Sequence, residues 1–81
     1  MLPRVPRPDL LTAGEAFEDL VFVGLARLPR PGEEVKTSRF HATIGGGAII
    51  TAVAGARLGL RSRVVSGLGR SALARLREEG V

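Results

Sequence analysis

IGGGAIITAVAGARLG, residues 44–59, is the segment from which the fold of this 81-residue chain is best predicted. Gly45, Gly46 and Gly47 are unfavourable inside a helix or strand, because glycine loses more backbone entropy on folding than any other residue. They suit a sharp turn, or a place where another group approaches the backbone closely. Residues 48–58 are small and apolar and predict a buried helix. A glycine turn before a helix exposes free N–H donors at the positive end of the helix dipole, where hydroxyl, phosphate or carboxylate groups can bind.

Short apolar runs on both sides of this segment predict β-strands, because each run is bounded by glycine or other turn residues. These predicted strands cover residues 10–13, 20–23, 35–44 and 61–66. Two prolines and a glycine predict a turn over residues 28–32. A last helix is predicted over residues 72–79, with Ser71 as its N-cap and Gly80 as its C-terminal stop.

Strands that alternate with helices predict an α/β fold with a parallel sheet. A parallel sheet is normally covered on both faces, and two predicted helices are too few for that. The sequence also ends at Val81, where a further strand would be expected. We therefore expect an irregular leader over residues 1–8, followed over residues 9–81 by the front part of a larger α/β domain.

The composition narrows the class of protein. The net charge is +4, and all 12 basic residues except Lys36 are arginines. A basic surface can bind nucleic acid, but here the arginines are dispersed and there is no Tyr or Trp to stack on bases, so the sequence does not favour that partner. The absence of cysteine excludes disulfides and thiolate metal sites. No apolar run approaches the roughly 18 residues of a membrane span, and the first residues lack a secretory signal, so we expect a cytoplasmic protein without a membrane partner.

Four segments, taken in order, resemble the N-terminal portion of the ribokinase-like (PfkB) carbohydrate kinase family. Residues 11–21 are similar to the family's first strand, with Gly14 followed five residues later by Asp19. LPRPGEE, residues 28–34, is similar to the turn that leads into the family's lid strands. Residues 45–59 resemble the family's glycine signature and the ARLG end of its helix. GLG, residues 67–69, falls where the family places its next glycine-containing strand end.

The resemblance implies the N-terminal part of a ribokinase-like three-layer αβα fold, with a parallel central sheet and lid strands. It implies an ATP-dependent kinase that transfers the γ-phosphoryl group of ATP, with Mg²⁺, to a hydroxyl of a sugar or nucleoside. Asp19, Gly45, Gly46 and Gly47 would bind the acceptor. The lid strands would help to close the site and form a homodimer.

In proteins of this family, the catalytic aspartate and the site for ATP and Mg²⁺ lie in the C-terminal half, beyond the part that these residues resemble. We therefore expect no catalytic and no metal-binding residue in this chain, and no kinase activity from the 81 residues alone.

Two positions depart from the family pattern. Ile50 stands where the family usually has an asparagine, and isoleucine cannot hydrogen-bond a sugar hydroxyl. Arg70-Ser71 replaces an acidic pair. These departures indicate either adaptation to a different substrate or a degenerate, non-catalytic remnant, and they leave the acceptor unidentified.

The polar candidates each have a simpler interpretation. In the functional interpretation, an ionised Asp19 accepts hydrogen bonds from two hydroxyls of a polyol. In the simpler interpretation, Asp19 is a solvated loop acid. The glycine run could serve as a tight turn only. Glu15 and Glu18 flank Asp19, but solvated faces explain both better than a carboxylate cluster. His41, on the predicted lid strand, is best interpreted as an exposed strand residue. Arg39, on the same strand, is best interpreted as exposed to solvent or held in an ion pair.

Several other catalytic classes are excluded by missing motifs. A Ser/His/Asp triad cannot be argued from one histidine without a G-x-S-x-G turn. The glycines are not followed by the Gly-Lys-Ser/Thr of a phosphate-binding loop, and a G-x-G-x-x-G dinucleotide motif fails at Ala48 and Ile50. The alternative from another functional class is a small basic α/β interaction module that binds nucleic acid.

Overall fold

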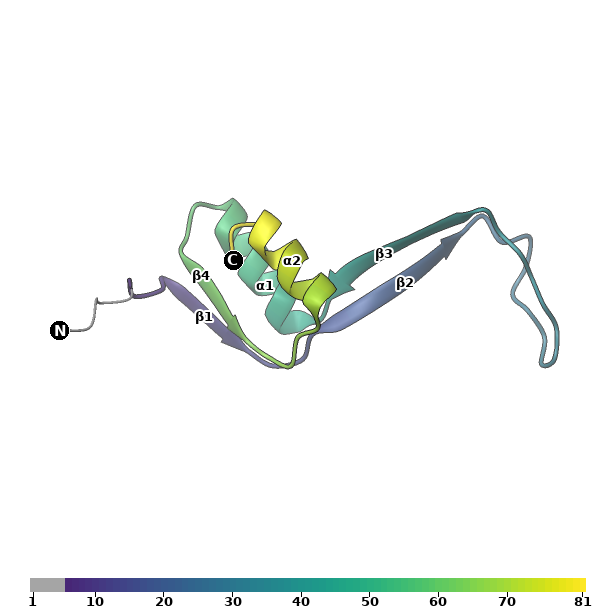
Figure 1. The fold of residues 1–81 in the computed structure, drawn as a ribbon, viewed down its shortest axis with the longest axis horizontal. Coiled ribbons are helices and arrows are strands. Elements are labelled where there is room, and N and C mark those ends of the chain that lie inside the picture. The colour runs from purple at the N-terminus through teal and green to yellow at the C-terminus, as the bar shows by residue number, and fades with distance from the viewer. Residues whose placement is uncertain (1–5) are drawn as a thin grey trace.

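A computed structural model describes residues 6–81, and these form a small α/β unit from which a long hairpin projects (Figure 1). The predicted leader, residues 1–8, therefore lies mostly outside the described residues. In chain order the elements are β1 (Leu10–Ala13), β2 (Phe17–Val23), β3 (Arg39–Gly45), α1 (Gly47–Arg57), β4 (Ser62–Val65) and α2 (Arg70–Glu78).

β1 and β4 form a two-stranded parallel sheet, in which Leu10 pairs with Ser62 and Ala13 with Val65. Parallel neighbours need a crossover connection, and α1 supplies it by running back over the sheet. The Thr12 hydroxyl donates a 2.8 Å hydrogen bond to the carbonyl of Ala48, which holds β1 against the first turn of α1. The predicted α/β arrangement with parallel strands is thus confirmed. We call β1, β4, α1 and α2 the body.

Both helices lie on the same side of the parallel pair (Figure 1). The buried apolar side chains come from the helices: Ile49, Ala52, Ala72 and Leu76. The buried face of α1 consists of Ile49 and the small residues Ala52 and Gly55, and the small residues let the helix approach the sheet closely. A Cβ atom on Gly55 would lie only 2.5 Å from Cδ2 of Leu10, so glycine is needed at this contact.

The last helix ends as the sequence predicts but begins differently. Gly80 adopts a φ of 82°. The N–H of Gly80 donates to the carbonyl of Arg77, and the N–H of Val81 donates to the carbonyl of Leu76. These two hydrogen bonds close the helix in a Schellman motif. The prediction that Ser71 caps the start of the helix is wrong. α2 begins at Arg70 after an N-cap glycine, and no side chain caps it.

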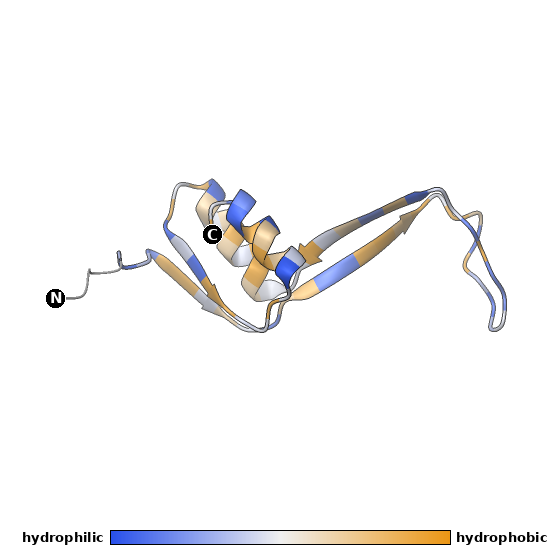
Figure 2. Ribbon diagram, viewed as in Figure 1, coloured by the Kyte–Doolittle hydropathy of each residue, from blue (hydrophilic) through white to orange (hydrophobic). Residues whose placement is uncertain are grey.

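β2 and β3 form an antiparallel hairpin, residues 17–45, that we call the arm. Phe22 pairs with Phe40 near its far end, and their ring centroids are 5.1 Å apart. Beyond the strands, the N–H of Glu33 donates to the carbonyl of Arg30 at 2.9 Å, and Gly32 between them has a φ of 76°. The turn predicted at residues 28–32 therefore forms. Figure 2 shows apolar and polar bands in both strands of the arm.

Two predictions need correction, the start and burial of the strand now seen as β3 and the burial of the first helix, whereas the open face of the parallel pair agrees with the expectation that two helices are too few to cover both of its faces. The strand predicted to start at residue 35 starts at Arg39, and both of its faces are largely exposed. The helix predicted to be buried is buried on one side only, and Ile50 is 62% exposed. The second face of the parallel pair is open, so that Leu11 and Val65 are each 61% exposed. Among the described residues no element covers these surfaces.

Candidate functional site

The glycine run lies where the arm joins the body. Gly45 is the last residue of β3, Gly46 is the N-cap of α1, and Gly47 is the first residue of that helix. The predicted turn from strand into helix is therefore confirmed.

Gly46 is required by the backbone. Its φ is 98°, a conformation that side chains disfavour, and a Cβ atom there would overlap the carbonyl oxygen of Glu15 and lie 3.2 Å from the ring of Phe17. The simpler interpretation of a tight turn therefore accounts for Gly46 without a ligand. Gly47 differs, because a Cβ atom there would meet open space.

Asp19 lies directly beside Gly45. A Cβ atom on Gly45 would be 2.6 Å from Oδ2 of Asp19, so the missing side chain makes room for the carboxylate. Asp19 pairs with Thr43 across the strands, and paired residues share a face of the hairpin. The Asp19 side chain is exposed and, among the described residues, accepts no hydrogen bond. The structure thus brings two of the predicted site residues together and leaves both carboxylate oxygens available to a ligand.

The start of α1 adds donors to this place. The first helical hydrogen bond is donated by the N–H of Ile50 to the carbonyl of Gly46, at 2.9 Å. No side chain caps the helix, and no acidic residue lies in its first turn. The preceding N–H groups are therefore free donors at the positive end of the helix dipole.

The other predicted polar residues do not join Asp19. Glu18 lies on the opposite face of the arm and accepts a 3.0 Å hydrogen bond from Ser71 of α2, so the carboxylates form no cluster. Arg39 extends across Gly24 near the far end of the arm, where its Cδ is 3.7 Å from a Cβ position on that glycine. His41 pairs with Val21 and so shares the face of Asp19, one strand repeat further out.

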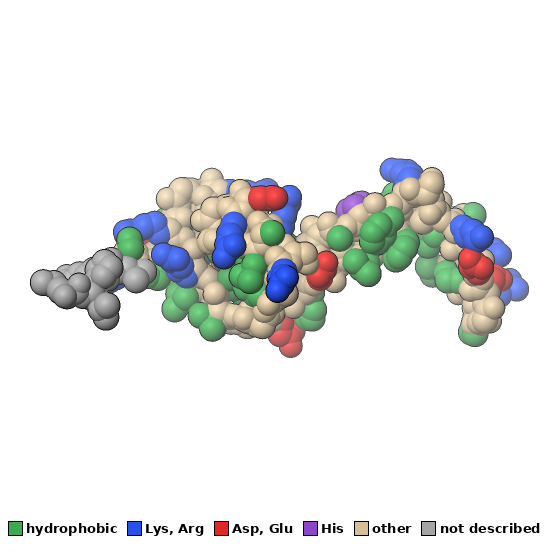
Figure 3. All heavy atoms as spheres, in the orientation of Figure 1, with side chains coloured by type: hydrophobic (Ala, Val, Ile, Leu, Met, Phe, Trp, Pro, Cys, Tyr) green, Lys and Arg blue, Asp and Glu red, His purple; other side chains and the backbone are tan. Residues whose placement is uncertain are grey.

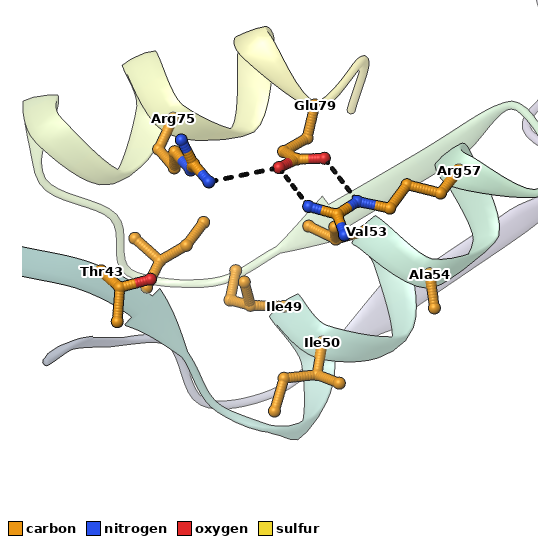
Figure 4. Close-up of a pocket in the computed structure, with 9 residues that line it drawn as sticks. Thr43, Ile49, Ile50, Val53, Ala54, Arg57, Arg75 and Glu79 are labelled. Atoms are coloured by element: carbon orange, nitrogen blue, oxygen red, sulfur yellow. Dashed lines mark hydrogen bonds and ion pairs between the residues drawn. The ribbon is translucent and has the colours of Figure 1, made fainter.

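The sequence analysis missed a hollow beside this junction. It has a volume of about 300 Å³ and lies between the end of β3, the outer face of α1, and α2 (Figure 4). Its lining residues are mostly apolar with a charged end: Thr43, Ile44, Ile49, Ile50, Val53, Ala54, Arg57, Arg75 and Glu79. The spacing of Ile50, Ala54 and Arg57 at i, i+4 and i+7 marks one helix face, and that signal could have indicated this wall.

The charged end of the hollow is an ion-pair network that links the two helices (Figure 4). Arg57 donates to both oxygens of Glu79, at 2.8 Å and 2.6 Å, and Arg75 approaches the same carboxylate at 3.4 Å. These hydrogen bonds from Arg57 lower the pKa of Glu79, whereas its partial burial acts in the opposite direction. The network offsets the unfavourable position of an acid at the C-terminal end of α2.

Comparisons with protein-family models, curated proteins and solved structures found no match. The geometry of the site must therefore be interpreted from its own residues.

Two further features concern ligands and membranes. Within residues 6–81, no three or more His, Asp or Glu side chains come together as a group that could hold a metal ion. Neither described helix has the length and continuous apolar character needed to cross a membrane.

Proposed function

We propose that this chain is the acceptor-binding part of an ATP-dependent carbohydrate kinase of the ribokinase-like type. The observation that carries the proposal is the placement of an unpaired carboxylate, Asp19, against Gly45 at the uncapped start of α1. An acceptor-only carboxylate beside free backbone N–H donors suits a polyol, whose hydroxyl groups both donate and accept.

The reaction implied is transfer of the γ-phosphoryl group of ATP to an acceptor hydroxyl, which depends mainly on positioning and charge stabilisation. The resemblance to the family places ATP and Mg²⁺ outside these residues, so we derive no step through them. In this chain, Asp19 orients the acceptor and the arm covers it, which would limit access of water to the transferring group.

The open surfaces of the body support the wider fold proposal. Parallel sheets are normally covered on both faces, and here the face that carries Leu11 and Val65 is open. Further helices on that face would complete a three-layer αβα domain.

The arm also suits a homodimer. One of its faces carries apolar side chains that are more than half exposed, among them Leu20, Phe22 and Phe40 (Figure 3). This face is opposite to that of Asp19, because neighbouring residues of a strand point to opposite sides. Two copies could therefore pack through their arms while each acceptor site stays accessible.

A nucleic-acid function has less support. Arg27, Arg57, Arg61 and Arg75 each form an ion pair with a carboxylate in the described part of the chain. Pairing lowers the positive charge available to phosphates. We therefore make no second proposal.

The test is the Asp19→Ala substitution in the intact protein, with steady-state kinetics for both substrates. Loss of a charge-assisted hydrogen bond costs about 1.5–3 kcal/mol, so the KM for the acceptor should rise roughly ten- to a hundred-fold while that for ATP stays unchanged. Glu34→Gln is the matched control, because this exposed acid has only a 3.7 Å contact with Lys36. An unchanged acceptor KM in Asp19→Ala would show that Asp19 is only a surface acid.

A further inference from the structure

A second, smaller hollow adjoins the first where the base of the arm meets α2. It has a volume of about 80 Å³, and two of its lining residues are charged: Glu18 from β2 and Arg75 from α2. The small and the large hollow share Thr43, Ile44 and Arg75 in their linings. One ligand can therefore occupy both.

The small hollow offers an acceptor and a donor of opposite charge. In the described part of the chain Glu18 and Arg75 form no ion pair with each other. Ser71 donates to Oε2 of Glu18 at 3.0 Å, which leaves the other carboxylate oxygen available. Arg75 contacts Glu78 and Glu79 at 3.4 Å each, longer than the roughly 2.7–2.9 Å of a strong charge-assisted hydrogen bond. Glu18 can thus accept from a cation, and Arg75 can donate to an anion.

The large hollow adds an apolar wall to this charged place (Figure 4). Ile44 pairs with Glu18 across the arm, so both side chains lie on the same face of the hairpin. From Ile44 the wall continues over α1 with Ile49, Ile50 and Val53. Its volume of about 300 Å³ is at the lower end of the range for small-molecule sites. The two hollows therefore fit a small ligand with one charged end and one apolar end.

We propose that the two hollows together bind a free α-amino acid with an apolar side chain. Its ammonium group donates to Glu18, and its carboxylate accepts from Arg75. Its side chain packs on Ile50 and Val53. An α-amino acid carries both charged groups on one carbon atom, just as one small hollow holds both of their partners. Glu18 and Asp19 point to opposite faces of the arm, so this proposal is independent of the proposed function.

The experiment is a calorimetric titration of the full chain with L-leucine and with probes that each lack one of its features. 4-Methylpentanoate lacks the ammonium group, L-leucinamide lacks the carboxylate, and L-alanine lacks most of the apolar side chain. Each probe should bind about ten-fold more weakly than L-leucine, or weaker still. A lost charge-assisted hydrogen bond has an effect of this size, and so has the loss of several buried methyl or methylene groups.

Two variants assign the charged groups to their partners. In Glu18→Gln the advantage of L-leucine over 4-methylpentanoate should disappear, while the glutamine can still accept from Ser71. In Arg75→Gln the advantage of L-leucine over L-leucinamide should disappear. Arg77→Gln is the matched control and should leave both preferences intact, because Arg77 also belongs to α2 but lines neither hollow. Melting curves by circular dichroism show that folded proteins are compared.

The comparison of probes in the parent protein decides the proposal even if a variant fails to fold. Equal binding of L-leucine and L-leucinamide overturns it and indicates a peptide N-terminus as the ligand. Equal binding of L-leucine and 4-methylpentanoate overturns it and indicates a simple carboxylate. No binding of L-leucine, or binding unchanged in both folded variants, also overturns it. None of these results affects the proposal for Asp19, which is tested by its own variant.

Discussion

The body and the arm are built from strands with similar sequence patterns, but they differ in what covers those strands. In the body, α1 and α2 pack on one face of the parallel pair, and Ala52 and Ile49 are fully or almost fully buried. In the arm, the paired rings of Phe22 and Phe40 are each more than half exposed. An alternating pattern indicates a strand, but only the rest of the fold decides whether its apolar face is buried.

The difference has a consequence for stability. Burial of apolar surface is the main favourable term in folding, at roughly 25 cal/mol per Å². The body gains from this term, whereas an isolated two-stranded hairpin is marginal in water. Cooperative unfolding should therefore report on the body, and the arm should open first.

The largest effect is expected at the tightest contact of the body. Gly55→Val should destabilise the body by about 1–3 kcal/mol or more, because its Cβ would lie 2.5 Å from Leu10 and 2.7 Å from the hydroxyl of Ser62. Gly47→Ala, also in α1, should instead be neutral or stabilising by up to about 1 kcal/mol, since a Cβ there meets open space. Urea unfolding measures both. If the two variants were equally stable, the helix would not be packed on the sheet as described.

A second prediction concerns the arm. Replacing Phe22 and Phe40 together by serine should leave the urea midpoint of the body almost unchanged, because neither ring packs on the body. The same double variant should weaken self-association, measured by sedimentation, since it removes two aromatic groups from the proposed dimer surface. Hydrogen exchange in the parent protein should show fast exchange in the arm and slower exchange in α1. A large loss of body stability in the double variant would show that the two regions fold as one unit.

The local structure was largely predictable from the sequence. The glycine run between apolar segments predicted the turn from β3 into α1, and Gly80 predicted the end of α2, because both depend on local backbone chemistry. The start of α2 was not predictable from Ser71. The hydroxyl of that residue has a distant partner, Glu18 of the arm, and a contact between residues so far apart in sequence leaves no local pattern.

The candidate site was predictable only in part. Asp19 and Gly45 were selected through the family resemblance, and the structure places them in contact. The hollow was missed because it needs three elements to meet, and its charged end combines Arg57 with Glu79, 22 residues away in sequence. The spacing of residues within α1 could have indicated the wall of the hollow that this helix forms, but not the opposite wall, which α2 provides.

The smallest expected effect tests the ion pairs that join the elements of the body. The folded state lowers the pKa of Glu79 through hydrogen bonds from Arg57, and it lowers that of Asp9 through hydrogen bonds from Arg61. A lowered pKa stabilises the fold above the unfolded value, about 4.3 for Glu and 3.9 for Asp, and this stabilisation is lost as the pH falls through the folded value. The parent protein should therefore lose stability on acidification below about pH 5.

Glu79→Gln isolates one of these pairs. The variant should be less stable than the parent at neutral pH, and the difference between their urea midpoints should shrink as the pH falls, because a protonated Glu79 no longer attracts Arg57. The effect should be small and should decrease further with added salt, since the pair is accessible to solvent. A gap between Glu79→Gln and the parent that stays constant down to pH 3 would mean that Glu79 holds α2 against α1 by packing rather than by charge.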